Sequence, residues 1–153
     1  MKNTDNPANT ATDNTDTTIR DIMTPDPVGV YFDQTVSETA RIMRDAQVGA
    51  VLVVSGESLT GVVTDRDLVV RGLAAGGSPD DPVGPLCSPK LVGVAADADL
   101  AHAEQLIMEN AVRRLPVIDA EGQIVGMVSM GDLAVSANGD SPLAAVTRAA
   151  PNV

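Results

Sequence analysis

Two short motifs in the chain combine a hydroxyl and a carboxylate at the same spacing. Thr64 is followed three residues later by Asp67, and Ser129 is followed three residues later by Asp132. A hydroxyl at the start of a helix can donate to phosphate, beside backbone amides that attract anions. A carboxylate three residues on can accept both hydrogen bonds of a ribose diol. The spacing is also typical of an ordinary helix N-cap, which the motif alone favours. Its occurrence twice favours a binding role.

A pair of adjacent arginines, Arg113 and Arg114, stands out because the chain is strongly acidic. Its formal net charge is −11, from 10 basic and 21 acidic residues. Arginine suits bidentate binding of phosphate. The alternative is a solvated basic pair that offsets nearby acids. The matching stretch around Val48 and Gly49 has no arginine, so we expect two related but unequal clefts.

The sequence offers little for other chemistry. It has no P-loop, no GxGxxG motif and no Ser/His/Asp or Cys/His set. The chain has one histidine, His102, and one cysteine, Cys87. These exclude an intramolecular disulfide and cannot form an ordinary zinc site without carboxylates. We expect His102 to be exposed and Cys87 to be a small buried residue, with a redox role left open. We therefore predict no catalytic residues, no metal, no required cofactor and a reducing, cytoplasmic location.

Charge and hydropathy also limit the partners. A protein this acidic repels nucleic acid and anionic membranes. The segment 1–18 lacks the apolar core of a signal peptide, and no apolar run is long enough to span a membrane. We expect neither a nucleic acid nor a membrane as partner.

An internal repeat organises the chain. The segment 61–68 matches 126–133 at an offset of 65 (126 − 61), and Ile42-Met43 matches Ile107-Met108 at that offset. Near the start of each unit, 28–30 matches 92–94 at an offset of 64 (92 − 28). This pattern predicts one inserted residue between the start of the second unit and its first helix.

Each repeat unit has the same predicted order, β-α-β-β-α. The strands are expected at 28–31, 50–54 and 59–64, then at 92–95, 115–118 and 124–129. Second helices are expected at 65–75 and 131–137. The first helices are expected to start at a Thr35–Glu38 capping box and at Asp97, with apolar stripes of Val36, Ala40, Met43 and of Leu100, Ala103, Ile107. The methionines Met23, Met43, Met108, Met127 and Met130 are predicted to fill the core.

The fold class that follows is α/β (α+β), with two units packed about a pseudo-twofold axis. Each unit, at about 60 residues, is too small to have much core of its own. The predicted organisation is a disordered tail at 1–17, units at 18–77 and 78–137, and a C-terminal tail at 138–153. The two clefts between the units are the candidate sites.

Five blocks carry a resemblance to a known family: 21–25, 48–54, 59–68, 113–118 and 126–133. Together they resemble a tandem pair of CBS domains, also called a Bateman module. The likeness covers about residues 18–137. It includes short stand-alone bacterial members such as actinobacterial hypoxic response proteins. The resemblance implies binding of AMP, ADP, ATP or S-adenosylmethionine in the clefts between the units, and a dimer shaped as a flat disc.

The resemblance also implies roles for individual residues. One cleft would use Ser129, Arg113 and Arg114 on phosphate, Asp132 on ribose, and Thr24, Val28 and Val48 against adenine with Met127 nearby. The other would use Thr64, Asp67 and Val62, together with Ser88, Val92 and Val112. We expect the cleft that contains Asp132 to bind nucleotide more tightly.

The function that these observations favour is a regulatory, ligand-sensing module. An adenine nucleotide would change its conformation or its dimer, and a separate, unknown effector protein would respond. The alternatives are a ligand-free structural dimerisation or interaction module, an S-adenosylmethionine sensor and, with least support, a phosphate-transferring enzyme. The predicted homodimer face is apolar: Leu68, Val69, Val70, Leu73, Leu133 and Val135. Simple core packing is the other explanation of these residues.

Overall fold

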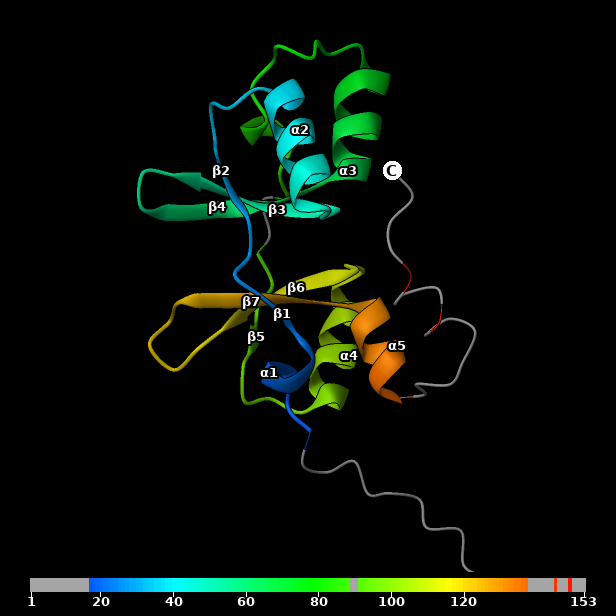
Figure 1. Ribbon diagram of the computed structural model, residues 1–153. Helices are drawn as coiled ribbons and strands as arrows, with labels where there is room; N and C mark the ends of the chain where they lie inside the picture. The colour runs from blue at the N-terminus through cyan, green and yellow to red at the C-terminus, as the bar shows by residue number, and fades with distance from the viewer. Residues whose placement is uncertain (1–16, 89–90, 138–144, 146–148, 150–153) are drawn as a thin grey trace, which may run out of the picture.

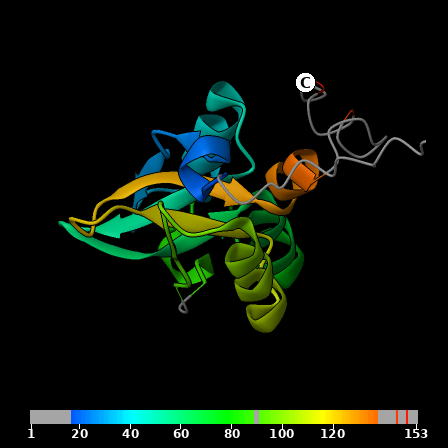
Figure 2. The ribbon, with the colours of Figure 1, turned by 90° about the horizontal axis from the view of Figure 1, so that it is seen from below.

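Two β-sheets face each other across the centre of the molecule, with helices on their outer sides (Figure 1). The computed structural model describes residues 17–88, 91–137, 145 and 149. Both hairpin turns lie at the same end of the molecule, as Figure 1 and the view from below in Figure 2 agree. The mixed α/β class predicted from the sequence is confirmed.

The first unit contains a three-stranded sheet in the order β2-β3-β4. Strand β2 runs parallel to β3, and β3 runs antiparallel to β4. A helical segment follows β4 and changes type along its length, from α to π to 3₁₀. The elements are β2 (Gly29–Tyr31), α2 (Val36–Ala46), β3 (Ala50–Ser55), β4 (Ser58–Thr64), α3 (Asp65–Asp67), the π-helix η1 (Leu68–Gly72) and the 3₁₀-helix η2 (Leu73–Ala75).

The second unit repeats this arrangement with one additional strand, in the order β1-β7-β6-β5. Its helix after β7 is a regular α-helix. The elements are β5 (Val94–Ala95), α4 (Leu100–Asn110), β6 (Arg114–Ile118), β7 (Ile124–Ser129) and α5 (Met130–Ala137). Figure 2 shows α4 and α5 on the same side of the molecule.

The segment that precedes each unit in the sequence, here called its leading segment, packs on the other unit. Helix α1 (Ile19–Ile22) and strand β1 (Thr24–Pro25) pack on the second unit, where β1 pairs with β7. The segment that leads into the second unit packs instead on the first: it contains η3 (Gly84–Leu86), and Ser88 bridges to Val62 of β4. Ile19 and Val83 are fully buried, each in the core of the other unit. Apolar burial therefore ties the two units together.

The leading segments cross β4 and β7 so closely that each strand needs a glycine at the contact. A Cβ at Gly61 would lie 2.4 Å from the Ser88 carbonyl oxygen, and one at Gly126 would lie 2.8 Å from that of Thr24. Because backbone atoms cannot move aside, any side chain would push the crossing segment away. The two glycines serve the same purpose in the two halves.

The one-residue insertion in the second unit lies in its hairpin turn, not before its first helix as predicted. Helices α2 and α4 have equal lengths and end at left-handed residues, Gln47 and Ala111, at an offset of 64 (111 − 47). The offset becomes 65 only after the turn, where Thr64 and Ser129 end their strands (129 − 64). The predicted match of Ile42-Met43 with Ile107-Met108 is therefore wrong by one residue. Buried Met43 corresponds to buried Ile107.

Most predicted helix signals are confirmed, with three corrections. Thr35 and Glu38 form the predicted capping box. Helix α4 is capped by Asp99, not by Asp97, because the Asp99 carboxylate accepts from the His102 amide at 2.7 Å. In α2 the buried position is Thr39, whereas Ala40 is exposed. Of the methionines predicted to fill the core, Met108 and Met130 are wrong, since both are exposed.

The predicted dimer face divides into two sets. Leu68 and Leu133 are buried within their own units and Val135 is half-buried. Val69, Val70 and Leu73 are about half exposed, on the outer side of the first unit. No helix in the described part of the chain is long and apolar enough to cross a membrane. The tails predicted at 1–17 and 138–153 fall almost entirely outside the described residues.

Candidate functional site

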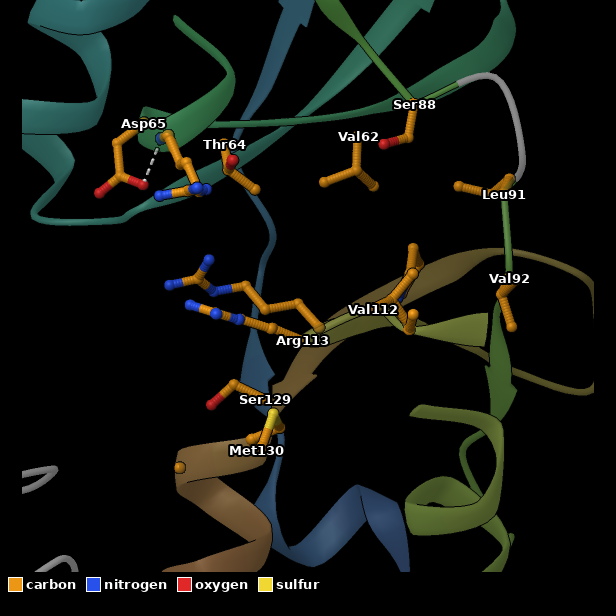
Figure 3. Close-up of a pocket in the computed structure, with 15 residues that line it drawn as sticks. Val62, Thr64, Asp65, Ser88, Leu91, Val92, Val112, Arg113, Ser129 and Met130 are labelled. Atoms are coloured by element: carbon orange, nitrogen blue, oxygen red, sulfur yellow. Dashed lines mark hydrogen bonds between the residues drawn. The ribbon is translucent and has the colours of Figure 1, made fainter. Parts of the chain in front are cut away.

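A cavity of about 690 Å³ lies between the two units. Figure 3 shows its walls, which come from both sheets and from the points where the sheets pass into helices. Its volume is within the range of small-molecule sites, roughly 300–1,000 Å³. The lining residues are Val62, Thr64, Asp65, Arg66, Ser88, Leu91, Val92, Ala111, Val112, Arg113, Arg114, Pro116, Ser129, Met130 and Gly131.

One end of the cavity is apolar. Val62 lies on β4, and Val92 and Val112 precede β5 and β6, with Leu91 close by (Figure 3). Ser88 is held at this end because its amide donates to the Val62 carbonyl at 2.9 Å. Such a surface suits the face of a flat, uncharged ring such as a nucleobase.

The other end is cationic. Arg113 and Arg114 enter from the start of β6 in the second unit, and Arg66 enters from α3 of the first. Among the described residues, these three side chains make no hydrogen bond or ion pair within the protein. The only acidic residue among the cavity's lining residues is Asp65. Unpaired guanidinium groups on facing walls form an anion site in a chain whose overall charge is −11.

The two hydroxyl–carboxylate motifs form matching capping boxes. The Thr64 hydroxyl donates to Asp67 Oδ2 at 2.7 Å and accepts from the Asp67 amide at 3.2 Å. The Ser129 hydroxyl donates to Asp132 Oδ2 at 2.7 Å and accepts from the Asp132 amide at 3.3 Å. In both motifs one carboxylate oxygen is committed to the helix start. Only Oδ1 of each aspartate remains for a ligand, and that of Asp67 lies 3.8 Å from Arg71 Nη1.

Comparison with known proteins identifies the family. The CBS domain family model matches residues 19–72 and 83–138, one match in each unit. The chain belongs to the CBS domain family. The tandem CBS pair predicted from the sequence is confirmed.

Several CBS proteins are similar over most of their length. CBS domain-containing protein YhcV of Bacillus subtilis is 38% identical over 118 residues, which are 77% of this chain and 84% of the relative. Hypoxic response protein 1 of Mycobacterium tuberculosis is 37% identical over 120 residues, or 77% and 83% of the two chains. A crystal structure of Hypoxic Response Protein I, with two coordinated zinc ions, has a TM-score of 0.66 and 37% identity, covering 77% and 97%. A crystal structure of CBSX2 in complex with AMP has a TM-score of 0.64 and 29% identity, covering 78% and 95%.

Within this CBS pair, the cavity contains residues from both predicted clefts. Eight of the predicted site residues line it: Val62, Thr64, Ser88, Val92, Val112, Arg113, Arg114 and Ser129. Six do not: Thr24, Val28, Val48, Asp67, Met127 and Asp132. The arginines therefore share a cavity with the Thr64 set, whereas the sequence grouped them with Asp132. Which of the predicted residues lie together depends on how the two sheets pack against each other. The repeat in the sequence does not contain this information.

Sequence reasoning missed Asp65 and Arg66, which line the cavity between the two residues of the first motif. Their counterparts, Met130 and Gly131, line it from the second motif. The signal available in the sequence was their position: residues inside a motif at a strand–helix junction face the same space as the motif.

The remaining candidates for chemistry lie outside the cavity. Cys87 is buried beside β4, and burial raises the pKa of its thiol, the opposite of what a reactive thiolate needs. His102 is exposed, as predicted. Across the described residues, no group of three or more His, Cys, Asp or Glu side chains is placed to hold a metal ion.

Proposed function

We propose that this CBS pair is a regulatory module that binds an adenine nucleotide in the cavity between its units. The observation that carries the proposal is the separation of the cavity into an apolar end and an arginine-lined end. A nucleotide has the same two-part character, with an uncharged aromatic base whose faces suit apolar contact and an anionic phosphate. The complex of the related CBSX2 with AMP supports this choice.

The charge of the cavity distinguishes between the candidate ligands. Three arginines and one aspartate among its lining residues give a formal charge of +2 (3 − 1). A phosphate group is attracted to such a site. S-adenosylmethionine is repelled, because its sulfonium and ammonium groups outweigh its one carboxylate and leave it with a net positive charge. We therefore place AMP, ADP or ATP ahead of S-adenosylmethionine.

The two related clefts are unequal, so we propose one tightly bound nucleotide per chain. The positions that correspond to Arg113 and Arg114 in the first unit are Gly49 and Ala50, and the position that corresponds to Arg66 is Gly131. The related cleft therefore lacks counterparts of Arg113 and Arg114, whereas Arg66 and Gly131 both line the cavity described above. This proposal places the tighter site on the Thr64 side, unlike the expectation from sequence, which favoured Asp132.

We also propose that the module acts as a cytoplasmic homodimer without enzymatic activity and signals to a separate effector protein. Val69, Val70 and Leu73 form an exposed apolar surface on η1 and η2 that a second copy could cover. Ligand binding shifts an equilibrium only through different affinities for two states. The two states here are two orientations of the units, because the ligand contacts both. Replacing Leu73 with Glu should convert the dimer to a monomer in analytical ultracentrifugation, and a monomeric wild type would contradict the dimer.

Calorimetric titration tests the nucleotide site. Wild-type protein is titrated with AMP, ADP, ATP, S-adenosylmethionine and adenosine, followed by Arg114→Ala. Loss of a charge-assisted hydrogen-bonded pair should weaken AMP binding by about tenfold or more and leave adenosine unchanged. Arg20→Ala is the matched control, because Arg20 is exposed on α1 and is not among the residues that line the cavity.

Each outcome has a clear meaning. Binding of one nucleotide per chain that weakens in Arg114→Ala but not in Arg20→Ala supports the proposal. No binding of any of these ligands at millimolar concentration would instead favour the ligand-free interaction module. Preference for S-adenosylmethionine over all three nucleotides would contradict the charge argument.

A further inference from the structure

Gly49 occupies a position that does not need glycine for its backbone. It immediately precedes β3, and its carbonyl accepts from the Asp65 amide at 3.2 Å. The glycines with positive φ in the described chain are Gly56, Gly76 and Gly122. Gly49 therefore has a backbone that other residues adopt readily. The φ angle therefore does not explain the glycine at this position.

Two side chains of the cavity lie close to where a Cβ of residue 49 would be. A Cβ at Gly49 would lie 3.0 Å from Nη2 and 3.7 Å from Cζ of Arg114, and 3.2 Å from Oδ2 of Asp65. At Gly61 and Gly126, by contrast, the nearest atoms include a backbone carbonyl oxygen. Those two glycines allow backbone segments to pass closely, whereas Gly49 allows the side chain of Arg114 from the opposite unit to approach.

We propose that Gly49 is a positioning residue for the ligand site: it provides the space in which the Arg114 guanidinium reaches across from the second unit to the anionic end of the ligand. This inference rests on the proposed nucleotide function. It goes beyond that function by making the ligand class depend on a pair of residues, one in each unit, of which only Arg114 contacts the ligand.

Size complementarity between the units supports the proposal. Where the second unit has Arg113 and Arg114, the first has Gly49 and Ala50, which are the two smallest residue types. Two arginines in both units would place four long cationic side chains around the pseudo-twofold axis, where like charges repel. The glycine at position 49 leaves room for Arg114, and the pair of arginines is present in one unit only.

Enlarging residue 49 should displace the guanidinium and leave the apolar end intact. We expect Gly49→Val to weaken AMP binding by about tenfold, comparable to removing one charge-assisted pair, with adenosine binding unchanged. Gly49→Ala should have a smaller effect, because the flexible arginine has to move by only a few tenths of an ångström. Gly29→Ala is the matched control, since Gly29 is exposed on β2 and a Cβ there meets nothing within 4 Å. Thermal unfolding without ligand verifies that each variant is folded.

A double variant separates positioning from general damage. If Gly49 acts through Arg114, then Gly49→Val in an Arg114→Ala background should weaken AMP binding no further. Additive losses, equal losses for AMP and adenosine, or a Gly49→Val variant that binds AMP like wild type would each overturn the inference.

Failure of the proposed function would be visible separately, as wild-type protein that binds no adenine nucleotide. The inference is then tested with inorganic pyrophosphate, by following the side-chain Nε resonance of Arg114 by NMR. A pyrophosphate-induced shift in wild type that is lost in Gly49→Val would support the role of Gly49. No shift in wild type would refute it.

Discussion

The two strand–helix junctions of this protein have the same capping box and differ in the two residues inside it. Both have a hydroxyl and a carboxylate three residues apart, closed into capping boxes in which the hydroxyl–carboxylate hydrogen bond is 2.7 Å long. Between these residues the first junction has Asp65 and Arg66, whereas the second has Met130 and Gly131. The repeated part of the motif forms the helix start, and the part that differs adds Asp65 and Arg66 to the cavity lining from the first unit and Met130 and Gly131 from the second.

The largest expected effect concerns the exchanged leading segments. Ile19→Ala should lower the free energy of unfolding by about 2–5 kcal/mol, because it leaves a cavity in the core of the second unit. Val83→Ala should act in the same way in the first unit, with a smaller loss since valine has fewer carbons to remove. Urea denaturation measures both, with Arg20→Ala as control. An Ile19→Ala variant as stable as the control would show that α1 does not contribute to the core.

Replacing both arginines tests the asymmetry directly. Arg113→Gly with Arg114→Ala gives the second unit the residues of the first. Two lost charge-assisted contacts should weaken AMP binding by about 100-fold, or roughly 3 kcal/mol. Calorimetry should show adenosine binding unaffected. Nucleotide affinity that survived this double replacement would mean that the arginines are not the anion site.

The sequence predicted the elements well because they rest on local patterns. The hairpins, the order of strands and helices, and the capping box at Thr35 follow from alternation, turn residues and short-range hydrogen bonds. The exchange of leading segments was missed because β1 is very short and pairs with β7, a strand far along the chain. The inserted residue was misplaced because Ile42-Met43 matches Ile107-Met108 in letters, while burial pairs Met43 with Ile107. Eight of the predicted site residues line one cavity, but which of them lie together depends on how the two sheets are packed against each other. The repeat in the sequence does not contain that information.

We expect the two capping boxes to contribute equally to the free energy of unfolding. Thr64→Ala and Ser129→Ala should each lower the free energy of unfolding by about 1 kcal/mol, since each removes an N-cap acceptor. Chemical denaturation provides the measurement. Ser55→Ala, at the exposed end of β3, is a suitable control. A loss at one junction only would show that the two boxes are not equivalent in solution.

The smallest effect should come from the acid at the first junction. Asp65→Asn removes the only negative charge among the cavity's lining residues. AMP should then bind a few-fold more tightly, because one repulsion with phosphate is lost, and the gain should shrink as salt is added. The matched change at the related position, Met130→Gln, should leave affinity unchanged. Weaker AMP binding in Asp65→Asn would mean that the carboxylate orients a guanidinium rather than opposing the ligand.

The exchange of leading segments has a consequence for fragments of the chain. A proteolytic cut between Gly76 and Gly77 would separate two pieces, each carrying a segment that completes the core of the other. The pieces should therefore stay associated after cleavage and reassemble from separately produced halves. One half alone would lack part of its own core and would expose the edge strand that its partner normally covers. The two units therefore form one folding unit, although the sequence contains two repeats.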